Sequence, residues 1–391
     1  MSPSAAPPVN SAASLPPLSL YVHFPWCVRK CPYCDFNSHE FGNGFPEEDY
    51  VAALIRDLDY MRPAAGGRVI VSIFMGGGTP SLFTDAAISR LLAALRERLN
   101  LANEAEITLE ANPGTVEAGR FAGYRAAGIN RLSLGVQSFD NNRLAGLGRI
   151  HDADEARAAV RMAAAAGFDN INIDLMYGLP GQDPAGALRD IEAAADLAPA
   201  HLSWYQLTVE PNTVFYSRTP PLPGEDAVFA MQEQGQRLLS ERGYRRYEVS
   251  AWARPGREAA HNLNYWEFGD YLGLGAGAHS KLTDPAGFRV ERSARHRIPA
   301  RYLQTAGSTE AVTGRRVLEA DDLVLEFMMN ALRLQRGFDA ELFRARTGLL
   351  LDRVRDKLER AVALGLLSME DKVIRPTRRG TQFLNNLLQL F

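Results

Sequence analysis

The three cysteines of this chain are the residues with the clearest capacity for chemistry. Cys27, Cys31 and Cys34 lie within eight positions, in a C-x3-C-x2-C arrangement. Three thiolates on one short loop can surround one metal centre, but they do not fill the four-coordinate shell of a structural zinc site. A [4Fe–4S] cluster usually takes four cysteine ligands, so a cluster held by three keeps one iron open for a small ligand. The neighbouring Arg29 and Lys30 would stabilise the thiolates.

Two alternatives to a cluster remain open from the spacing alone. One is a zinc site completed by His23 or His39, and the other is three unrelated cysteines. A disulfide framework is excluded, because three cysteines in 391 residues cannot build one.

Residues 1–18 carry no charged side chain and no continuous apolar run, so they do not resemble a secretory signal. We predict a disordered tail over residues 1–18 and a cytoplasmic protein.

An alternation of strand-like and helical patterns positions the cysteine loop. Gly128 and Gly167 stand where helix C-caps are expected, just before the next strand. The alternation predicts parallel βαβ units and an α/β fold, an incomplete (β/α)6 barrel over residues 19–225, with a doubly wound sheet as the alternative. The strand-like runs are 19–24, 71–75, 106–111, 131–136, 170–175 and 201–207, and the helical patterns include Tyr50–Met61, Ala86–Leu99, Asp154–Ala166 and Ala185–Leu197.

Polar and glycine-rich segments follow each of these strands. In either architecture the ligand site lies at the carboxyl ends of the strands, so we expect these segments to meet on one face. A purely structural chain has no need of such a gathering. The segments are the cysteine loop, GGGTP at 76–80, Glu110 with Asn112 and Pro113, Gln137 with Ser138, Asp174, and Thr208 with Glu210.

The pattern changes after about residue 225. A connecting region over residues 226–310 contains a helical pattern at Ala227–Arg242 and the aromatic segment HNLNYWEFGDYLGLGAGAHS at 261–280. Residues 311–391 read as helices with one short hairpin, which predicts a smaller, winged-helix-like domain. Its predicted elements are the helices Asp321–Leu334, Asp339–Thr347, Leu351–Leu364 and Thr377–Leu390 and the strands Leu367–Met369 and Val373–Arg375.

Composition excludes several classes of protein. The formal charge is −3, with 43 Lys and Arg against 46 Asp and Glu, which argues against a dominant nucleic-acid surface. The five arginines between Arg289 and Arg301 are the one hint of a basic patch, and a solvated loop explains them more simply. No uncharged apolar stretch reaches the roughly 18 residues of a membrane helix, so we expect no integral membrane protein, with peripheral contact left open.

With these features together, the sequence resembles the radical S-adenosylmethionine (SAM) superfamily. C-x3-C-x2-C in the first βα loop is the signature of that superfamily, and an incomplete barrel is its fold. The resemblance implies that the open iron chelates the amino and carboxylate groups of SAM. GGGTP at 76–80 resembles the glycine-rich motif of the superfamily, in which glycines let the backbone approach the methionine moiety closely.

Within that superfamily, the sequence resembles the coproporphyrinogen III dehydrogenase-like subfamily. LYVHFPWC, FMGGGTPS, EANP, SLGVQSF, LGRIH and NIDLMYGLPGQ carry this resemblance over about residues 18–215. It implies that Glu110 and Asp174 accept hydrogen bonds from SAM, that Arg149 pairs with a carboxylate, and that aromatic rings pack on the sulfonium or adenine. The residues implied as SAM contacts are Tyr21, Tyr33, Gly77, Gly78, Thr79, Glu110, Gln137, Arg149 and Asp174.

Two departures from the dehydrogenases and one shared motif resemble the HemW heme-chaperone branch of that subfamily. The dehydrogenases carry a further cysteine where this chain has Phe36, and they carry a longer segment before the first strand. The third feature is the HNxxYW motif of the HemW branch, formed here by His261, Tyr265 and Trp266 with Asn262. A histidine among aromatics can ligate heme iron, although a packed core histidine is the alternative. His279 is a rival iron ligand.

The resemblance therefore implies a heme chaperone with a SAM-coordinated [4Fe–4S] cluster. The chain would bind the cluster, SAM and heme, and pass heme to an acceptor protein. A radical SAM oxidoreductase that acts on coproporphyrinogen III or a related tetrapyrrole is the second hypothesis. A radical SAM nucleic-acid modifier is a weaker third one. GLGAGA at 273–278 lacks the flanking elements of a dinucleotide loop and is discounted.

Overall fold

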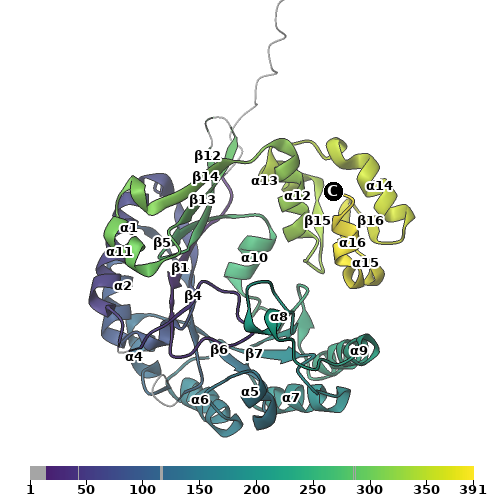
Figure 1. The fold of residues 1–391 in the computed structure, drawn as a ribbon. Helices are drawn as coiled ribbons and strands as arrows, with labels where there is room; N and C mark the ends of the chain where they lie inside the picture. The colour runs from purple at the N-terminus through teal and green to yellow at the C-terminus, as the bar shows by residue number, and fades with distance from the viewer. Residues whose placement is uncertain (1–14, 43, 115–117, 285, 287) are drawn as a thin grey trace, which may run out of the picture.

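Parallel strands form the centre of the fold. The computed structural model describes residues 15–42, 44–114, 118–284, 286 and 288–391 (Figure 1). The six predicted strands all form and pair in parallel with their neighbours. They are β1 (Leu18–Phe24), β4 (Val69–Gly77), β5 (Asn100–Ala111), β6 (Arg131–Gln137), β7 (Ile171–Tyr177) and β8 (His201–Gln206).

The order of these strands in the sheet follows their order in the chain, from β1 to β8. A doubly wound sheet reverses direction at a switch point, and this sheet does not, so the partial barrel is confirmed. Helices cover the outer side of the sheet (Figure 1). They include α1 (Glu47–Ala65), α2 (Asp85–Arg98), α4 (Phe121–Ala127), α6 (Ala153–Ala165) and α7 (Pro184–Asp196).

Local signals in the sequence explain where these helices begin and end. Asp152 caps α6 in a reciprocal capping box with Glu155, and Asp183 caps α7. Gly128 ends α4 with a φ of 109°, and Gly167 follows α6 with a φ of 88°. Both glycines therefore occupy the left-handed conformation that the sequence predicts for them.

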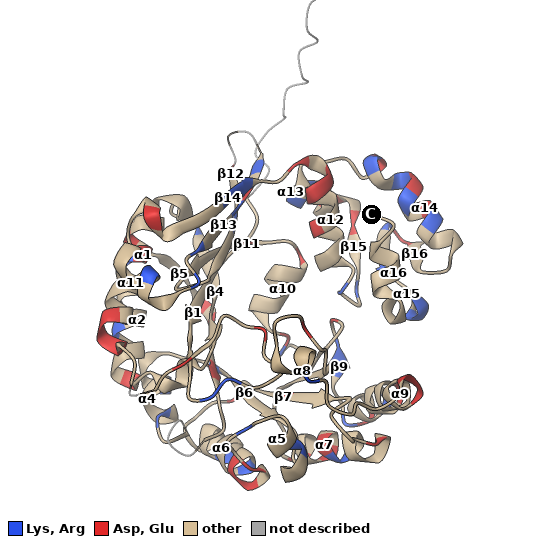
Figure 2. Ribbon diagram, viewed as in Figure 1, with Lys and Arg blue, Asp and Glu red and all other residues tan. Residues whose placement is uncertain are grey.

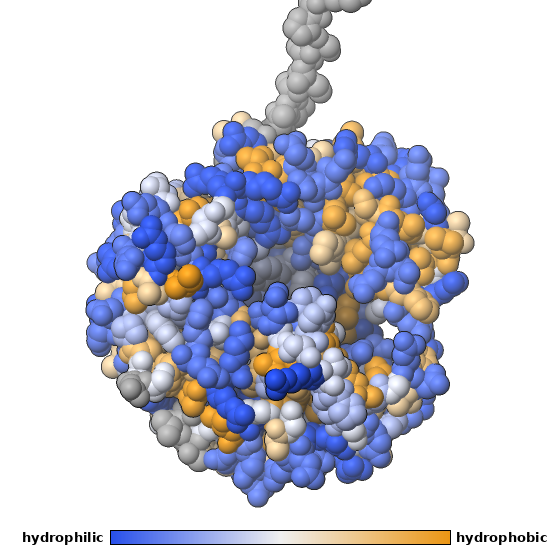
Figure 3. Space-filling view, in the orientation of Figure 1, coloured by the Kyte–Doolittle hydropathy of each residue, from blue (hydrophilic) through white to orange (hydrophobic). Residues whose placement is uncertain are grey.

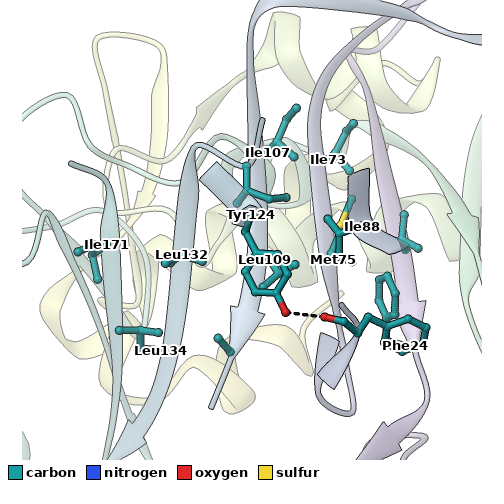
Figure 4. Packing of buried hydrophobic residues seen from close by; sticks show 14 of the residues in the cluster. Phe24, Ile73, Met75, Ile88, Ile107, Leu109, Tyr124, Leu132, Leu134 and Ile171 are labelled. Atoms are coloured by element: carbon teal, nitrogen blue, oxygen red, sulfur yellow. Dashed lines mark hydrogen bonds between the residues drawn. The ribbon is translucent and has the colours of Figure 1, made fainter. Parts of the chain in front are cut away.

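The main apolar core lies between the sheet and its outer helices. Ile73, Met75, Leu109 and Leu132 project from adjacent strands and are buried there (Figure 4). Parallel strands are buried on both faces, which explains why their sequences are nearly continuous apolar runs. Tyr124 on α4 places its hydroxyl in the same core, where it donates hydrogen bonds to backbone carbonyls.

The connecting region extends the sheet at both edges, although its local sequence patterns do not predict these strands. β11 (Asp270–Leu274) adds a seventh parallel strand beside β1, and β10 (Ala251–Ala253) pairs antiparallel with β8. Segments far apart in the chain thus become neighbours, because Leu20 pairs with Leu272. The remaining edge strands are β9 (Arg245–Arg246), β12 (His279–Asp284), β13 (Arg289–Arg295) and β14 (Val312–Val317).

The last part of the chain forms a second core. Phe327, Phe338 and Phe343 pack edge to face at its centre, and Phe268 and Val290 join from outside the predicted 311–391 segment. The structure places β14 in the large sheet, so this core begins near Leu318 rather than at residue 311. The helices are α12 (Ala320–Ala331), α13 (Ala340–Thr347), α14 (Arg355–Ala363), α15 (Arg378–Gln382) and α16 (Leu384–Leu388), with β15 (Phe338–Asp339), β16 (Leu367–Glu370) and β17 (Val373–Pro376) as a small sheet.

The predicted tail needs a correction at its end. Residues 1–14 lie outside the described residues, but the last residues of the 1–18 segment are attached to the fold. Arg68 donates a hydrogen bond to the carbonyl of Pro16, Asp270 N donates to Pro17 O at 2.9 Å, and Leu18 begins β1. Among the described helices, none has both the length and the apolar character needed to cross a membrane.

Charged side chains are spread over the outer surface. Figure 2 shows acidic and basic residues interspersed along the outer helices. Within the arginine-rich segment, Arg295 forms a buried ion pair with Asp57 at 3.0 Å, and Arg292 pairs with Glu326. Two of the five arginines that hinted at a basic patch therefore serve the fold.

Candidate cluster and cofactor site

The cysteine loop leaves β1 and is closed at its base by a short ladder. Cys27 ends β2 (Trp26–Cys27), which pairs with β3 (His39–Glu40). Cys34 N donates to Cys31 O at 3.0 Å, which forms a turn between the last two cysteines. The Lys30 ammonium donates to two backbone carbonyls of the same loop, at 3.0 and 3.3 Å. These contacts hold three free, partly exposed thiols in one compact loop.

Each thiol has a polar partner. Thr79 Oγ1 donates to Cys27 Sγ at 3.5 Å, and Arg149 Nη1 donates to Cys31 Sγ at 3.6 Å. Cys34 Sγ lies 3.8 Å from the hydroxyl of Ser38. Burial raises the pKa of the Cys27 and Cys34 thiols, while the hydrogen bonds from Thr79 and Ser38 act in the opposite direction. Donors aimed at sulfur favour thiolates, which are the form that binds metal.

The histidines proposed for a zinc alternative already have partners. His23 has one ring nitrogen 2.9 Å from the Tyr21 hydroxyl and the other 2.9 Å from Asn37 O. His39 Nε2 lies 3.3 Å from Asn37 Oδ1. Among the described residues, no three His, Cys, Asp or Glu side chains form a group suited to a single metal ion. A [4Fe–4S] cluster distributes its thiolates over several irons, so its ligands need not converge on one point.

The glycine-rich segment packs directly against the strand that leads to Cys27. Gly78 N donates to Phe24 O at 2.6 Å, and Thr79 N donates to Trp26 O at 2.8 Å. A Cβ at Gly78 would lie only 2.5 Å from Trp26 O. Gly77 has a φ of 114°, and a Cβ there would lie 2.5 Å from the ring of His23. Only glycine fits these two positions, so the backbone itself forms this wall.

Two partly buried carboxyl groups, those of Glu110 and Asp174, form the acidic wall. Gly77 N donates to Glu110 Oε2 at 3.0 Å. Asp174 accepts hydrogen bonds from Ser133 at 3.0 Å and from Asn172 at 2.9 Å. Burial raises the pKa of Glu110 to about 8, with a further contribution from the charge of Asp174, and burial also raises the pKa of Asp174. The positive charge of Arg131, which lines the same cavity, lowers both pKa values in part, and a further cation beside the two carboxyl groups would favour their ionised forms.

Arg149 connects this region to the cysteine loop. Its Nη2 donates to Asn112 Oδ1 and to Gly135 O, both at 2.7 Å, while its Nε is buried and has no hydrogen-bond partner among the described residues. Asn112 in turn donates to Thr79 Oγ1 at 3.1 Å. Tyr205 donates to Gln137 Oε1 at 2.9 Å, at a strand end where Gln137 has a φ of 73°. Hydrogen bonds therefore connect Cys27 to Cys31 through Thr79, Asn112 and Arg149.

These residues line one cavity of about 520 Å³. Parallel strands place their carboxyl ends at the same edge of a sheet, which is why segments far apart in sequence meet there. A recess is visible on the molecular face drawn in Figure 3, between the region of α8 (Val214–Ser217) and the C-terminal helices. Of the predicted residues, the cavity brings together Cys27, Cys31, Cys34, Tyr33, Gly77, Gly78, Thr79, Glu110, Gln137, Arg149 and Asp174.

Tyr21 is the predicted SAM contact that lines a different cavity. This second cavity has a volume of about 430 Å³ and shares Phe36, Phe74, Gly77 and Glu110 with the first. Tyr21 lies in β1 with its ring stacked near Phe74, at 6.3 Å between centroids. Its prediction as a direct SAM contact stays a prediction.

The predicted heme residues lie in three different environments. They belong to α10 (Ala260–Trp266). His261 is buried, stacks on Phe74 at 4.9 Å, and lines neither of the two cavities; burial lowers the pKa of its imidazole to about 3. Tyr265 lines the second cavity, and Trp266 lies under the guanidinium of Arg333 at 4.3 Å. The role of this trio in heme binding stays a prediction.

Comparison with known proteins identifies the family. The model of the radical SAM superfamily matches residues 21–198, and that of the HemN C-terminal domain matches residues 318–383. The heme chaperone HemW of Escherichia coli is 50% identical over 96% of this chain and 98% of the relative. Heme chaperone HemW of Haemophilus influenzae is 46% identical over 96% of this chain and 98% of the relative. This chain belongs to the HemW family.

A solved relative has the same architecture as this HemW-family chain. The structure of coproporphyrinogen III oxidase (HemN) from Escherichia coli, described as a radical SAM enzyme, matches with a TM-score of 0.82 and 28% identity. The match covers 96% of this chain and 90% of the HemN chain. The partial barrel, its added edge strands and the C-terminal module therefore form one architecture that HemN and this chain share.

Sequence reasoning missed several polar residues of the site in this HemW-family chain. Asn172 lines the first cavity and connects it to buried residues below. Its Oδ1 lies 2.6 Å from His201 Nδ1, and His201 Nε2 lies 2.9 Å from the hydroxyl of Tyr247, to which Asn262 also donates at 3.2 Å. The alternation along β7 carries a usable signal, because Asn172 and Asp174 are two positions apart and share a face.

Proposed function

We propose that this chain binds a [4Fe–4S] cluster through Cys27, Cys31 and Cys34 and binds SAM at the iron that no thiolate occupies. We further propose that it carries heme and delivers it to an acceptor protein. The observation that carries this proposal is the 50% identity to the Escherichia coli heme chaperone over nearly the whole chain. When bound, the cluster supplies an open coordination site for the amino and carboxylate groups of SAM.

The residues around the sulfurs hold the cluster ligands in place. Thr79 and Arg149 each donate a hydrogen bond to a ligand sulfur, and Asn112 joins Thr79 to Arg149. Charge-assisted donors stabilise thiolates more than neutral ones do, so Arg149 is the strongest of these contacts. The guanidinium of Arg149 lines the cavity, where its positive charge attracts an anionic group such as the carboxylate of SAM.

The acidic wall suits the positive charges of SAM. Glu110 and Asp174 are partly buried and line the cavity, and their mutual repulsion is relieved when a sulfonium or an ammonium group enters. Their remaining oxygen lone pairs accept hydrogen bonds from ribose hydroxyls. The Gly77–Gly78 backbone and the ring of Tyr33 complete the lining of this part of the cavity.

Two observations favour a chaperone over an oxidoreductase that converts coproporphyrinogen III. Phe36 is 58% exposed where the dehydrogenases are expected to carry a further cysteine, and it lies in the lining of both cavities. The second cavity is rich in aromatic side chains, which suits a flat apolar macrocycle.

The free thiols agree with a reducing compartment such as the cytoplasm.

An anaerobic reconstitution tests this proposal. We expect the reconstituted chain to contain iron and sulfide, to take up about one equivalent of hemin by Soret absorbance, and to transfer it to heme-depleted cytochromes of the expression host. The same preparation should give no decarboxylation of coproporphyrinogen III in the presence of SAM and reductant. Zinc in place of iron and sulfide would overturn the cluster assignment.

The alternative activity has its own signature. Conversion of coproporphyrinogen III that disappears in Cys27→Ser, Cys31→Ser and Cys34→Ser variants would favour the oxidoreductase. Failure of the native chain to bind hemin at all would overturn the chaperone proposal, whatever happens to SAM. Ser38→Ala is the control variant, because it removes a sulfur contact without removing a predicted ligand.

A further inference from the structure

The second cavity has walls that differ from those of the cluster cavity. Its lining comes from segments spread over most of the chain, from Tyr21 on β1 to Arg297 after β13. Its volume of about 430 Å³ lies within the usual range for small-molecule sites, roughly 300–1,000 Å³. It adjoins the cluster cavity, because Phe36, Phe74, Gly77 and Glu110 line both. A ligand in it would sit beside the cluster cavity without occupying it.

Aromatic rings form one wall of this cavity. Tyr21 stacks near Phe74 with an interplanar angle of 19°, and Tyr265 contacts Tyr271 at 4.4 Å between centroids. His261 stacks behind Phe74 and meets Tyr265 edge to face at 4.8 Å. The HNxxYW segment therefore supplies one ring to the wall and supports another from behind. Such a wall suits the apolar face of a large planar ligand.

His279 is the histidine at this cavity that is free to bind. It begins β12, is exposed, and its ring has no hydrogen-bond or ion-pair partner among the described residues. By contrast, both ring nitrogens of His23 are engaged, and His261 is buried behind Phe74. Partial burial lowers the pKa of His279, with the charges of Arg292 and Arg297 acting in the same direction. A neutral imidazole is the form that ligates metal.

Arg297 supplies a positive charge to the same cavity. Its side chain is exposed and has no carboxylate partner among the described residues. Asn37 holds its backbone, because Asn37 Nδ2 donates to Arg297 O and to Ala276 O, both at 2.9 Å. The same amide packs against Gly277, where a Cβ would approach it to 2.4 Å. An unpaired guanidinium at a cavity of aromatic rings suits a ligand that carries carboxylates.

From these features we infer that heme occupies the second cavity, with His279 as a ligand to the heme iron and Arg297 as the partner of a heme propionate. This inference rests on the proposed heme-carrying function and adds the place and the protein ligands to it. In this arrangement His261 positions the aromatic wall and does not bind iron. No redox step is involved, because the His279 nitrogen only replaces water at ferric iron.

Hemin titration of four variants tests the assignment in the anaerobically reconstituted full chain. His279→Ala should shift the Soret band and the ferric spin state and raise the dissociation constant at least about tenfold. Arg297→Gln should weaken hemin about tenfold without changing the spin state. His261→Ala should retain the ligand spectrum of the native chain. Arg301→Gln, an exposed arginine that pairs with Glu310 outside the cavity, is the matched control.

Metal-free protoporphyrin IX distinguishes binding through the heme iron from recognition of the porphyrin ring and its carboxylates. Because it has no iron, its binding should be unchanged by His279→Ala and weakened by Arg297→Gln. Exogenous imidazole should restore the native spectrum to a His279→Gly variant. An unchanged spectrum in His279→Ala, or a failure of imidazole to rescue His279→Gly, would overturn the inference. A native chain that takes up no hemin would instead refute the proposed function, so the two failures are distinguishable.

Discussion

The two cavities are adjacent, but they are built in different ways. The cluster cavity is assembled from strand ends and loops between Cys27 and Asn262, and its polar groups are mostly bonded to one another. The second cavity joins β1 to segments as far away as Arg297, and among the described residues the side chains of His279 and Arg297 have no hydrogen-bond or ion-pair partner. A bonded network holds ligand atoms in fixed positions before the cofactor arrives. Side chains that have no partner within the protein suit a ligand that the protein must also release.

The largest effect should follow from removing one thiolate. Cys31→Ser deletes the sulfur that accepts from Arg149 and leaves only two cysteines. We expect iron and sulfide to fall from about four of each per chain to less than one, and SAM binding to disappear. Iron and sulfide analysis after anaerobic reconstitution measures this. If hemin still binds to this variant, the two cavities act independently; simultaneous loss of hemin would show that they do not.

Next in size is a substitution in the glycine-rich wall. Gly78→Ala places a Cβ 2.5 Å from Trp26 O and 2.9 Å from Phe24 O, and neither backbone atom can move away easily. We expect the free energy of unfolding to fall by about 2–3 kcal/mol and SAM affinity to fall with it. Gly146→Ala is the control, because a Cβ there meets nothing within 4 Å. Equal denaturation midpoints for the two variants would contradict the tight packing.

The same contrast explains what the sequence could reveal. Period-two and helical patterns predicted the six parallel strands and therefore the face on which Glu110, Gln137 and Asp174 meet the cysteines. Those patterns are local, because the carboxyl end of each strand can be predicted from the residues of that strand and of the turn after it. The second cavity depends on the pairing of β11 with β1, which joins Leu20 to Leu272. No local pattern encodes that pairing, so the neighbourhood of Tyr21 and His279 became visible only in the folded chain.

An effect of comparable size should appear as a pH dependence of the cluster cavity. The folded-state pKa of Glu110, about 8, lies above the ordinary value of 4.5. The unfolded chain therefore binds fewer protons than the folded chain between these values, and stability falls as the pH rises through this window. In the cofactor-free chain we expect a loss on the order of a few kcal/mol from pH 5 to pH 8, measured by denaturant unfolding.

Substitution of Glu110 tests whether this carboxyl group causes the pH dependence. Glu110→Gln should flatten the pH dependence, while Glu104→Gln, at an exposed position on the same strand, should leave it unchanged. The affinity for SAM should rise with pH in the native chain, because the ionised carboxylate attracts the sulfonium, and it should not rise in Glu110→Gln. Identical pH profiles for the native chain and Glu110→Gln would assign the dependence to other groups.

The smallest effect concerns the buried chain of hydrogen bonds between the two regions. Tyr247 receives contacts from His201, below the acidic wall, and from Asn262 on α10, the helix that carries Tyr265 to the second cavity. Tyr247→Phe removes this hydroxyl and should lower the free energy of unfolding by about 1–2 kcal/mol. Because α10 then loses one of its supports, its amides should exchange faster while those of β4 stay protected. Unchanged exchange in α10 would mean that its position depends on aromatic packing alone, and that the two cavities share a wall but no polar connection.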